Sequence, residues 1–238
     1  SASIQGTDPG FSGYDGEKHL DVCASHGYVA SYLRAGVYFR RNLAVLRSAR
    51  LASIPVRQHP GRVKSGKIQG LMPDTDALAG VIHDLATYTS INNARFSGAQ
   101  QVKGRPRGEW YFTSRTMAAS TSDFGEIQRI RVMCVAAAAA LTAMAEYVGD
   151  DVETKTDGTG QITEAAAKAI EAEVTAKLKL AVVKAPNNFV TRASARITRT
   201  NNVLSTGELL CTISLVPRAN INAITTTITY TLTAAGDA

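Results

Sequence analysis

Two long segments with helical spacing, followed by segments that alternate apolar and polar residues, dominate the second half of this 238-residue chain. Asp123 is a helix start signal, and Glu126 lies at the position that would complete a capping box with it. These residues predict a helix over 124–147, which Gly149 ends. A second helix is predicted over 163–180, because its apolar and charged residues fall on opposite faces.

Three segments after residue 190 show the two-residue period of half-buried strands. They cover 193–198, 209–216 and 221–233, and a shorter strand-like run lies at 110–113. Together with the helices, they predict an α+β fold in which the two long helices pack on a mixed β-sheet.

The last predicted strand, 221–233, has one apolar face and one face of hydroxyl groups. It is long and unprotected by Lys or Pro, which is a liability in a monomer and an asset in an assembly. Such a segment can add to the sheet of another chain through main-chain hydrogen bonds. We therefore expect an intersubunit strand, whose candidate residues are Ile221, Ile224, Thr226, Ile228, Tyr230 and Leu232.

Composition divides the chain into three parts. Residues 1–18 are rich in Gly, Ser and Asp, which predicts a flexible N-terminal segment. Residues 19–72 form a basic N-terminal region, where we expect helical content broken near Gly36. Residues 73–238 form the α+β core, with a first helix expected at 78–88.

The net charge is +6, and the basic residues are unevenly placed, because 22–73 contains no Asp or Glu. Such a run can bind a phosphate backbone or dock an acidic protein face, and it can also be a solvated surface. No recognised nucleic-acid motif accompanies it. The arginines considered as a contact patch are Arg34, Arg40, Arg41, Arg47, Arg50 and Arg57.

The residue types that carry catalysis or bind metals form no recognisable pattern. There is no GxSxG elbow, Walker loop or GxGxxG motif, and none of the four histidines has HExxH spacing. Cys23, Cys134 and Cys211 lie far apart, and the last two fall in apolar runs typical of buried, inert thiols. The sequence therefore predicts a protein that is not an enzyme, with no catalytic residues, no cofactor and no metal site.

One apolar segment, 132–148, has to be weighed as a membrane span. It is short, dominated by alanine and interrupted by Glu146, whereas a spanning helix needs about 20 strongly apolar residues. We therefore expect a buried helix of a soluble protein and no membrane partner.

A set of residues occurs in a recognisable order between about 73 and 232. Its members are Trp110, Arg115, Thr116, Asp123, Phe124, Arg129, Arg131, Gly207 and Pro217. This order resembles the C-terminal part of contractile-tail sheath proteins. In that family, a Trp, an Arg-Thr pair, an Asp-aromatic pair and spaced arginines lead into a long helix, and a Gly and a Pro precede a last strand.

The resemblance implies a structural subunit of a contractile bacteriophage tail, or of a related injection device, without an active site. Such subunits form hexameric rings that stack into a helical sheath, and its contraction drives an inner tube through a cell envelope. The implied partners are further copies of this chain, a tail tube protein, the baseplate and a tail terminator. The implied location is the virion tail sheath, assembled in the host cytoplasm.

Charge offers a further expectation within this family. The basic stretch 34–67 and the acidic stretch 150–173 could mate between copies. Three other functions stay open, namely a basic nucleic-acid-binding module, another virion structural protein and, ranked below the nucleic-acid-binding module, an enzyme whose pocket would have to collect His26, His83 or Asp21. The resemblance implies no nucleic-acid partner.

Overall fold

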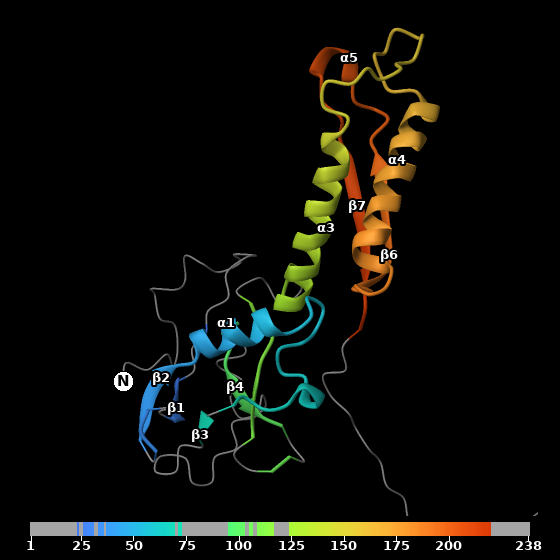
Figure 1. The fold of residues 1–238 in the computed structure, drawn as a ribbon. Helices are drawn as coiled ribbons and strands as arrows, with labels where there is room; N and C mark the ends of the chain where they lie inside the picture. The colour runs from blue at the N-terminus through green and yellow to red at the C-terminus, as the bar shows by residue number, and fades with distance from the viewer. Residues whose placement is uncertain are drawn as a thin grey trace, which may run out of the picture.

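The computed structural model describes residues 23, 26–30, 33–35, 37–69, 71–72, 95–102, 105–106, 109–116 and 124–219. In Figure 1 these residues form two regions, an upper body of two long helices over a pair of strands and a lower region of short strands and one helix.

The upper body has two layers, in which α3 and α4 pack on a two-stranded antiparallel sheet formed by β6 and β7 (Figure 1). The elements are α3 Ile127–Ala145, α4 Glu164–Leu178, β6 Val190–Ile197, α5 Val203–Thr206 and β7 Cys211–Pro217, with a π-helical turn at Lys179–Val183. The loop between α3 and α4 lies at the upper end of this body, and β7 ends at its lower end.

The core between these layers follows from the residue periods of its elements. In β6, alternate residues Ala193, Ala195 and Ile197 are buried, as the predicted strand 193–198 requires. The buried residues of α4 lie three or four apart, at Ala167, Ile170, Val174 and Leu178. The predictions of α4 and of the alternating strands β6 and β7 are therefore confirmed.

The face that α3 turns to the core is made mainly of alanine. Ala136, Ala140 and Ala143 are at most 3% exposed and belong to the same core cluster as α4 and β6. Small side chains let the backbone of α3 approach its neighbours closely, and larger ones would have no room in a close-packed interior.

The lower region holds shorter elements around a second small core. They are β1 His26–Ala30, β2 Tyr38–Asn42, α1 Ala44–Ser53, a 3₁₀ turn Val63–Ser65, β3 Leu71–Met72, β4 Ala99–Gln101 and β5 Trp110–Phe112. The strands form a β2-β1-β3 sheet and a β4-β5 pair. Leu43 and Phe112 are the buried centre of this region.

Three sequence predictions are corrected by these elements. Instead of one mixed sheet, every pair of named strands in the described part is antiparallel, and the strands form three separate small sheets. The expected helical content of 19–52 is strand in β1 and β2, because the two segments pair across five residues. Among the described residues of this range, the helix is α1.

The third correction concerns the start of α3. The capping-box prediction places Glu126 inside the helix, but its backbone is extended (φ −132°, ψ 131°) and it immediately precedes the helix. Glu126 pairs with Arg115 in an isolated antiparallel bridge, which keeps its backbone out of the helix. Asp123, the helix predicted at 78–88 and the strand predicted at 221–233 lie outside the described residues.

By length and composition, α3 is the helix in the described part that could cross a membrane. In its most apolar window, 33% of the residues are buried inside the protein. Its outer face exposes Leu141 and Cys134, so the expectation that Cys134 is a buried thiol is wrong. Cys211, on the core face of β7, is half-buried.

Candidate functional site

The outer edge of β7 carries backbone groups that face away from β6. The amide of Thr198 donates to the carbonyl of Leu210 (2.8 Å), which marks that pair as a hydrogen-bonded one in the antiparallel ladder. Hydrogen-bonded and non-hydrogen-bonded pairs alternate along such a ladder. The N–H and C=O groups of Cys211, Ile213 and Leu215 therefore point outward, and in the described part β7 pairs only with β6.

The outer edge of β6 is different, because side chains of α4 already occupy it. The amide of Ala195 donates to Thr175 Oγ1 (3.0 Å), and the amide of Ile197 donates to Glu171 Oε1 (2.6 Å). These two bonds satisfy outward-facing donors that an added strand would need. Of the two edges of this sheet, β7 is thus the one open to strand addition.

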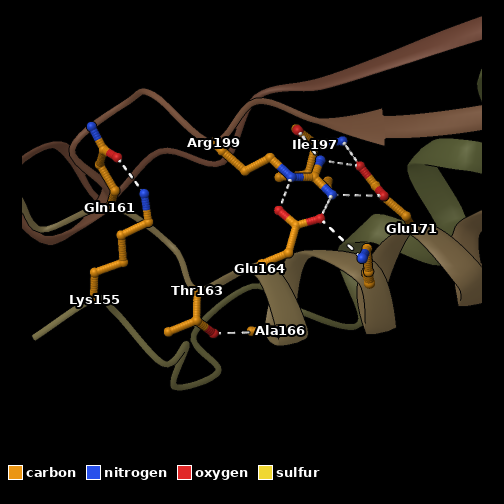
Figure 2. A network of polar contacts seen from close by, with 9 residues as sticks. Lys155, Gln161, Thr163, Glu164, Ala166, Glu171, Ile197 and Arg199 are labelled. Carbon is orange, nitrogen blue, oxygen red and sulfur yellow. Dashed lines mark hydrogen bonds and ion pairs between the residues drawn. The ribbon is translucent and has the colours of Figure 1, made fainter.

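A charged clamp holds the upper end of β6 against α4 (Figure 2). Arg199 Nε lies 2.7 Å from Glu164 Oε2, and Arg199 Nη2 lies 3.0 Å from Glu171 Oε2. A second contact joins Arg199 Nη1 to Glu171 Oε1, so the guanidinium engages two carboxylates at once. Hydrogen bonds from Arg199 lower the pKa of Glu164 to about 2 and lower the pKa of Glu171.

The start of α4 lies next to this clamp and has its own cap. Thr163 caps the helix, since its Oγ1 accepts a hydrogen bond from the amide of Ala166 (3.3 Å). Lys155 Nζ donates to Gln161 Oε1 (2.8 Å) in the preceding loop, as Figure 2 shows. The upper end of the body is therefore a set of linked polar contacts rather than a loose turn.

The proposed arginine patch is not a continuous surface. Arg47 is 2% exposed, donates to the carbonyl of Thr113 and lies over the Phe112 ring, 5.9 Å from its centroid. Arg50 donates to the carbonyls of Ser65 and Gly66 at 3.1 Å. Arg47 is therefore a core residue and cannot contact a partner at the surface.

The other members of this set are placed separately. Arg34 and Arg57 are exposed, and Arg40 and Arg41 lie on β2, opposite Tyr28 and Gly27 of β1. Only some of the predicted arginines can thus meet a partner.

The residues of the family resemblance take mainly structural positions. Thr116 is buried, and its hydroxyl donates to the carbonyl of Phe124 (2.6 Å). Gly207 ends α5 in the left-handed region (φ 66°), which a residue with a Cβ rarely adopts. Arg131 donates to the carbonyl of Ile54 (3.2 Å), and burial lowers its pKa. Trp110 lies in β5.

Three residues singled out in the sequence converge at one pocket. Arg57, Arg129 and Pro217 line a pocket of about 370 Å³ at the lower end of the upper body. Arg218, which the sequence analysis did not single out, also lines it. The one sequence feature that could have identified Arg218 as a candidate is its position directly after Pro217, at the end of a strand of alternating apolar and polar residues.

In the part of the chain that the structure describes, no three His, Cys, Asp or Glu side chains are placed to hold a metal ion. The geometry that stands out is therefore a strand edge and a charged pocket, and both are features of surfaces that contact other protein chains.

Comparison with solved structures connects this fold to contractile injection systems. The chain matches a chain of the anti-feeding prophage (AFP) baseplate with a TM-score of 0.62 and 12% identity, over 97% of its own length. It matches the contracted sheath complex of the extracellular contractile injection system PVC with a TM-score of 0.60 and 13% identity, over 98%. It matches the contracted helical sheath of AFP with a TM-score of 0.60 and 14% identity, over 95%.

The chain spans only about three fifths of the chains that it matches, namely 59%, 62% and 59%. Neither a protein-family model nor the sequence of a curated protein matches it. The likeness therefore establishes a fold shared with contractile sheath structures, at low sequence identity.

Proposed function

We propose that this chain is a structural subunit of a contractile sheath, which polymerises around an inner tube and contracts to drive that tube through a cell envelope. The observation that carries the proposal is the fold likeness to two contracted sheaths and a baseplate chain of contractile injection systems, over at least 95% of this chain. The role is non-enzymatic, and the partners are further copies of the chain, a tube protein, a baseplate and a terminator. The particle is a phage tail or an injection device built in the cytoplasm of its host.

The outer edge of β7 supports a specific way of joining copies. The segment 221–233 of a neighbouring copy would pair with β7, and its apolar face would extend the face of β7 that packs on the helices. Each outward N–H and C=O of Cys211, Ile213 and Leu215 would then gain a main-chain partner. Addition to β6 is disfavoured, because Thr175 and Glu171 already accept from its outward amides.

A rigid upper body suits a lattice that changes its contacts between two states. The Arg199 clamp and the α3–α4–β6 core hold this body together, so contraction can move whole subunits while their strand connections persist. In this proposal, the switch lies between subunits and not inside the described fold.

The test is a pair of variants at one position, Ile213→Pro and Ile213→Ala. Both remove the Ile213 side chain from the core, but only proline removes the outward N–H, which makes no bond to β6. We expect Ile213→Ala to form ordered assemblies like the original chain and Ile213→Pro to form none, measured by electron microscopy and light scattering.

Circular dichroism of both variants serves as the control for folding. Equal assembly by two folded variants would rule out strand addition at β7. The fold likeness would then have to be explained by a sheath that joins its subunits elsewhere.

A further inference from the structure

We propose that the arginine-rimmed pocket at the lower end of the upper body binds the acidic loop 150–157 of a second copy of this chain. The proposal rests on the proposed function in one respect, since it assumes that copies meet in an assembly. It adds a second contact, which is distinct from strand addition at β7.

The lining of the pocket combines apolar and basic side chains, and the three arginines are called its rim below. Its volume is about 370 Å³, and its apolar lining includes Val132, Met133 and Phe189. Arg57, Arg129 and Arg218 contribute the rim from three different segments of the chain. Three cations that converge on one concave site favour a negatively charged occupant.

The rim arginines are largely available to a partner. Arg57 is exposed and has no ion pair within the described residues. Arg218 is exposed and contacts the side-chain oxygen of Asn188. Arg129 pairs with Glu126 (3.4 Å) and keeps 41% of its side chain exposed. One carboxylate against three guanidinium groups leaves a net positive site.

Gln128 indicates that the occupant is a peptide rather than a simple anion. This residue is 2% exposed and lines the pocket, and its Nε2 donates to Glu126 Oε2 (2.8 Å). Its Oε1 is buried and has no hydrogen-bond partner in the described part. A buried acceptor without a donor is costly, and the N–H of an incoming backbone would satisfy it. An inorganic anion has no N–H to offer.

The loop between α3 and α4 offers carboxylates at the opposite end of the same body (Figure 1). Its exposed acidic residues are Asp150, Asp151, Glu153 and Asp157. Its backbone is already ordered, because Lys155 N donates to Gln161 O (2.7 Å) and Thr163 N donates to Glu153 O (3.0 Å). A preformed loop loses less conformational entropy on binding than a flexible one.

Geometry requires that the two parts meet between copies. The 19 residues of α3 separate the two ends by about 28 Å, so the loop cannot reach the pocket of its own chain. A contact between different surfaces of two identical chains is heterologous, and it generates rings or open helical filaments. This contact is thus suited to a helical sheath.

The test is direct binding of a fluorescent peptide with the sequence of residues 149–164, which includes Gln161 and Thr163 as partners of the two loop hydrogen bonds, to the 238-residue chain, followed by anisotropy. We expect saturable binding that weakens as salt increases. Arg57→Glu with Arg218→Glu should weaken it at least tenfold. Arg192→Glu with Arg196→Glu, the same charge change at exposed positions of β6 outside the pocket, should leave it unchanged.

Two results would overturn the proposal, namely no saturation by about 1 mM peptide, or equal affinity in the pocket variant and its β6 control. Gln128→Met keeps the size of the side chain and removes the acceptor, and it should weaken binding about fivefold. An unchanged affinity in Gln128→Met would show that Gln128 Oε1 does not accept a hydrogen bond from the backbone of the bound loop.

Assembly distinguishes this contact from the proposed function. The pocket variant and Asp150→Lys with Asp151→Lys should each fail to assemble alone. Their mixture should assemble, because the unchanged loop of the pocket variant fits the unchanged pocket of the loop variant, and the reversed charges of the altered loop and the altered pocket attract each other in the next contact. If both variants assemble alone as the original chain does, the contact is wrong and the sheath function stands. If the peptide binds as expected but the original chain never assembles, even in the presence of its tube protein and baseplate, the sheath function is wrong.

Discussion

Among single residues, Arg199 and Arg47 show what a sequence can and cannot reveal about a basic side chain. Arg199 clamps two carboxylates of α4, whereas Arg47 lies in the core beside Phe112. Their partners, Glu164 and Thr113, are far away in sequence. The pattern of charges along the sequence shows which segments are rich in basic residues. It does not show which of these side chains form contacts inside the folded chain.

The clamp at Arg199 predicts how stability depends on pH. The pKa of Glu164 falls from its ordinary value of 4.5 to about 2 in the folded chain, and the pKa of Glu171 is lowered too. A group whose folded pKa is lowered stabilises the fold above its unfolded pKa, and this contribution is lost as the pH falls through the folded pKa. The chain should therefore lose stability between about pH 4.5 and pH 2.

Arg199→Met is the variant that isolates this effect. It should lower the melting temperature by a few degrees at pH 7, and the gap to the original chain should close towards pH 2. The measurement is thermal unfolding by circular dichroism across this range. A gap that stays constant down to pH 2 would show that the clamp is not the source of the acid sensitivity.

Among the elements, α4 was predictable and β1 and β2 were not. The cap at Thr163 and the spacing of Ile170 and Val174 are local signals, and local signals suffice for an amphipathic helix. The β2 strand depends on pairing with β1, which is a nonlocal contact that no window of sequence contains. The predicted start of α3 was wrong for the same reason, because a nonlocal bridge between Arg115 and Glu126 sets the residue at which the helix begins.

The alanine face of α3 gives a prediction at this scale. Ala140→Leu should destabilise the fold by about 1–3 kcal/mol, because Ala140 is 3% exposed and an added side chain must displace its neighbours. Ala137→Leu is the matched control, since Ala137 is an exposed alanine of the same helix. Its effect should stay within about 0.5 kcal/mol. Urea unfolding of both variants measures the difference, and equal destabilisation would contradict the packing described for α3.

Over the whole molecule, the fold class was predictable from the sequence, whereas the surfaces proposed for assembly were not. The α+β class and the resemblance to contractile sheath proteins could be predicted from the sequence, and the structure and its comparison with solved structures agree with both. The open edge of β7 and the pocket could not be predicted from the sequence. Both depend on which backbone groups and arginines stay available for contacts with another chain once the fold has formed. The engagement of Arg47 and Arg50 inside the lower region also weakens the case for nucleic-acid binding.

The most direct test of the central claim is cryo-electron microscopy of the full-length chain at high concentration, beside a variant that lacks residues 221–238. If strand addition at β7 joins the subunits, we expect helical or ring-shaped assemblies in which a strand from another copy lies along the outer edge of β7. The shortened chain should stay folded and unassembled. An assembled particle with the edge of β7 open to solvent, or assemblies of the shortened chain that match those of the full chain, would contradict it.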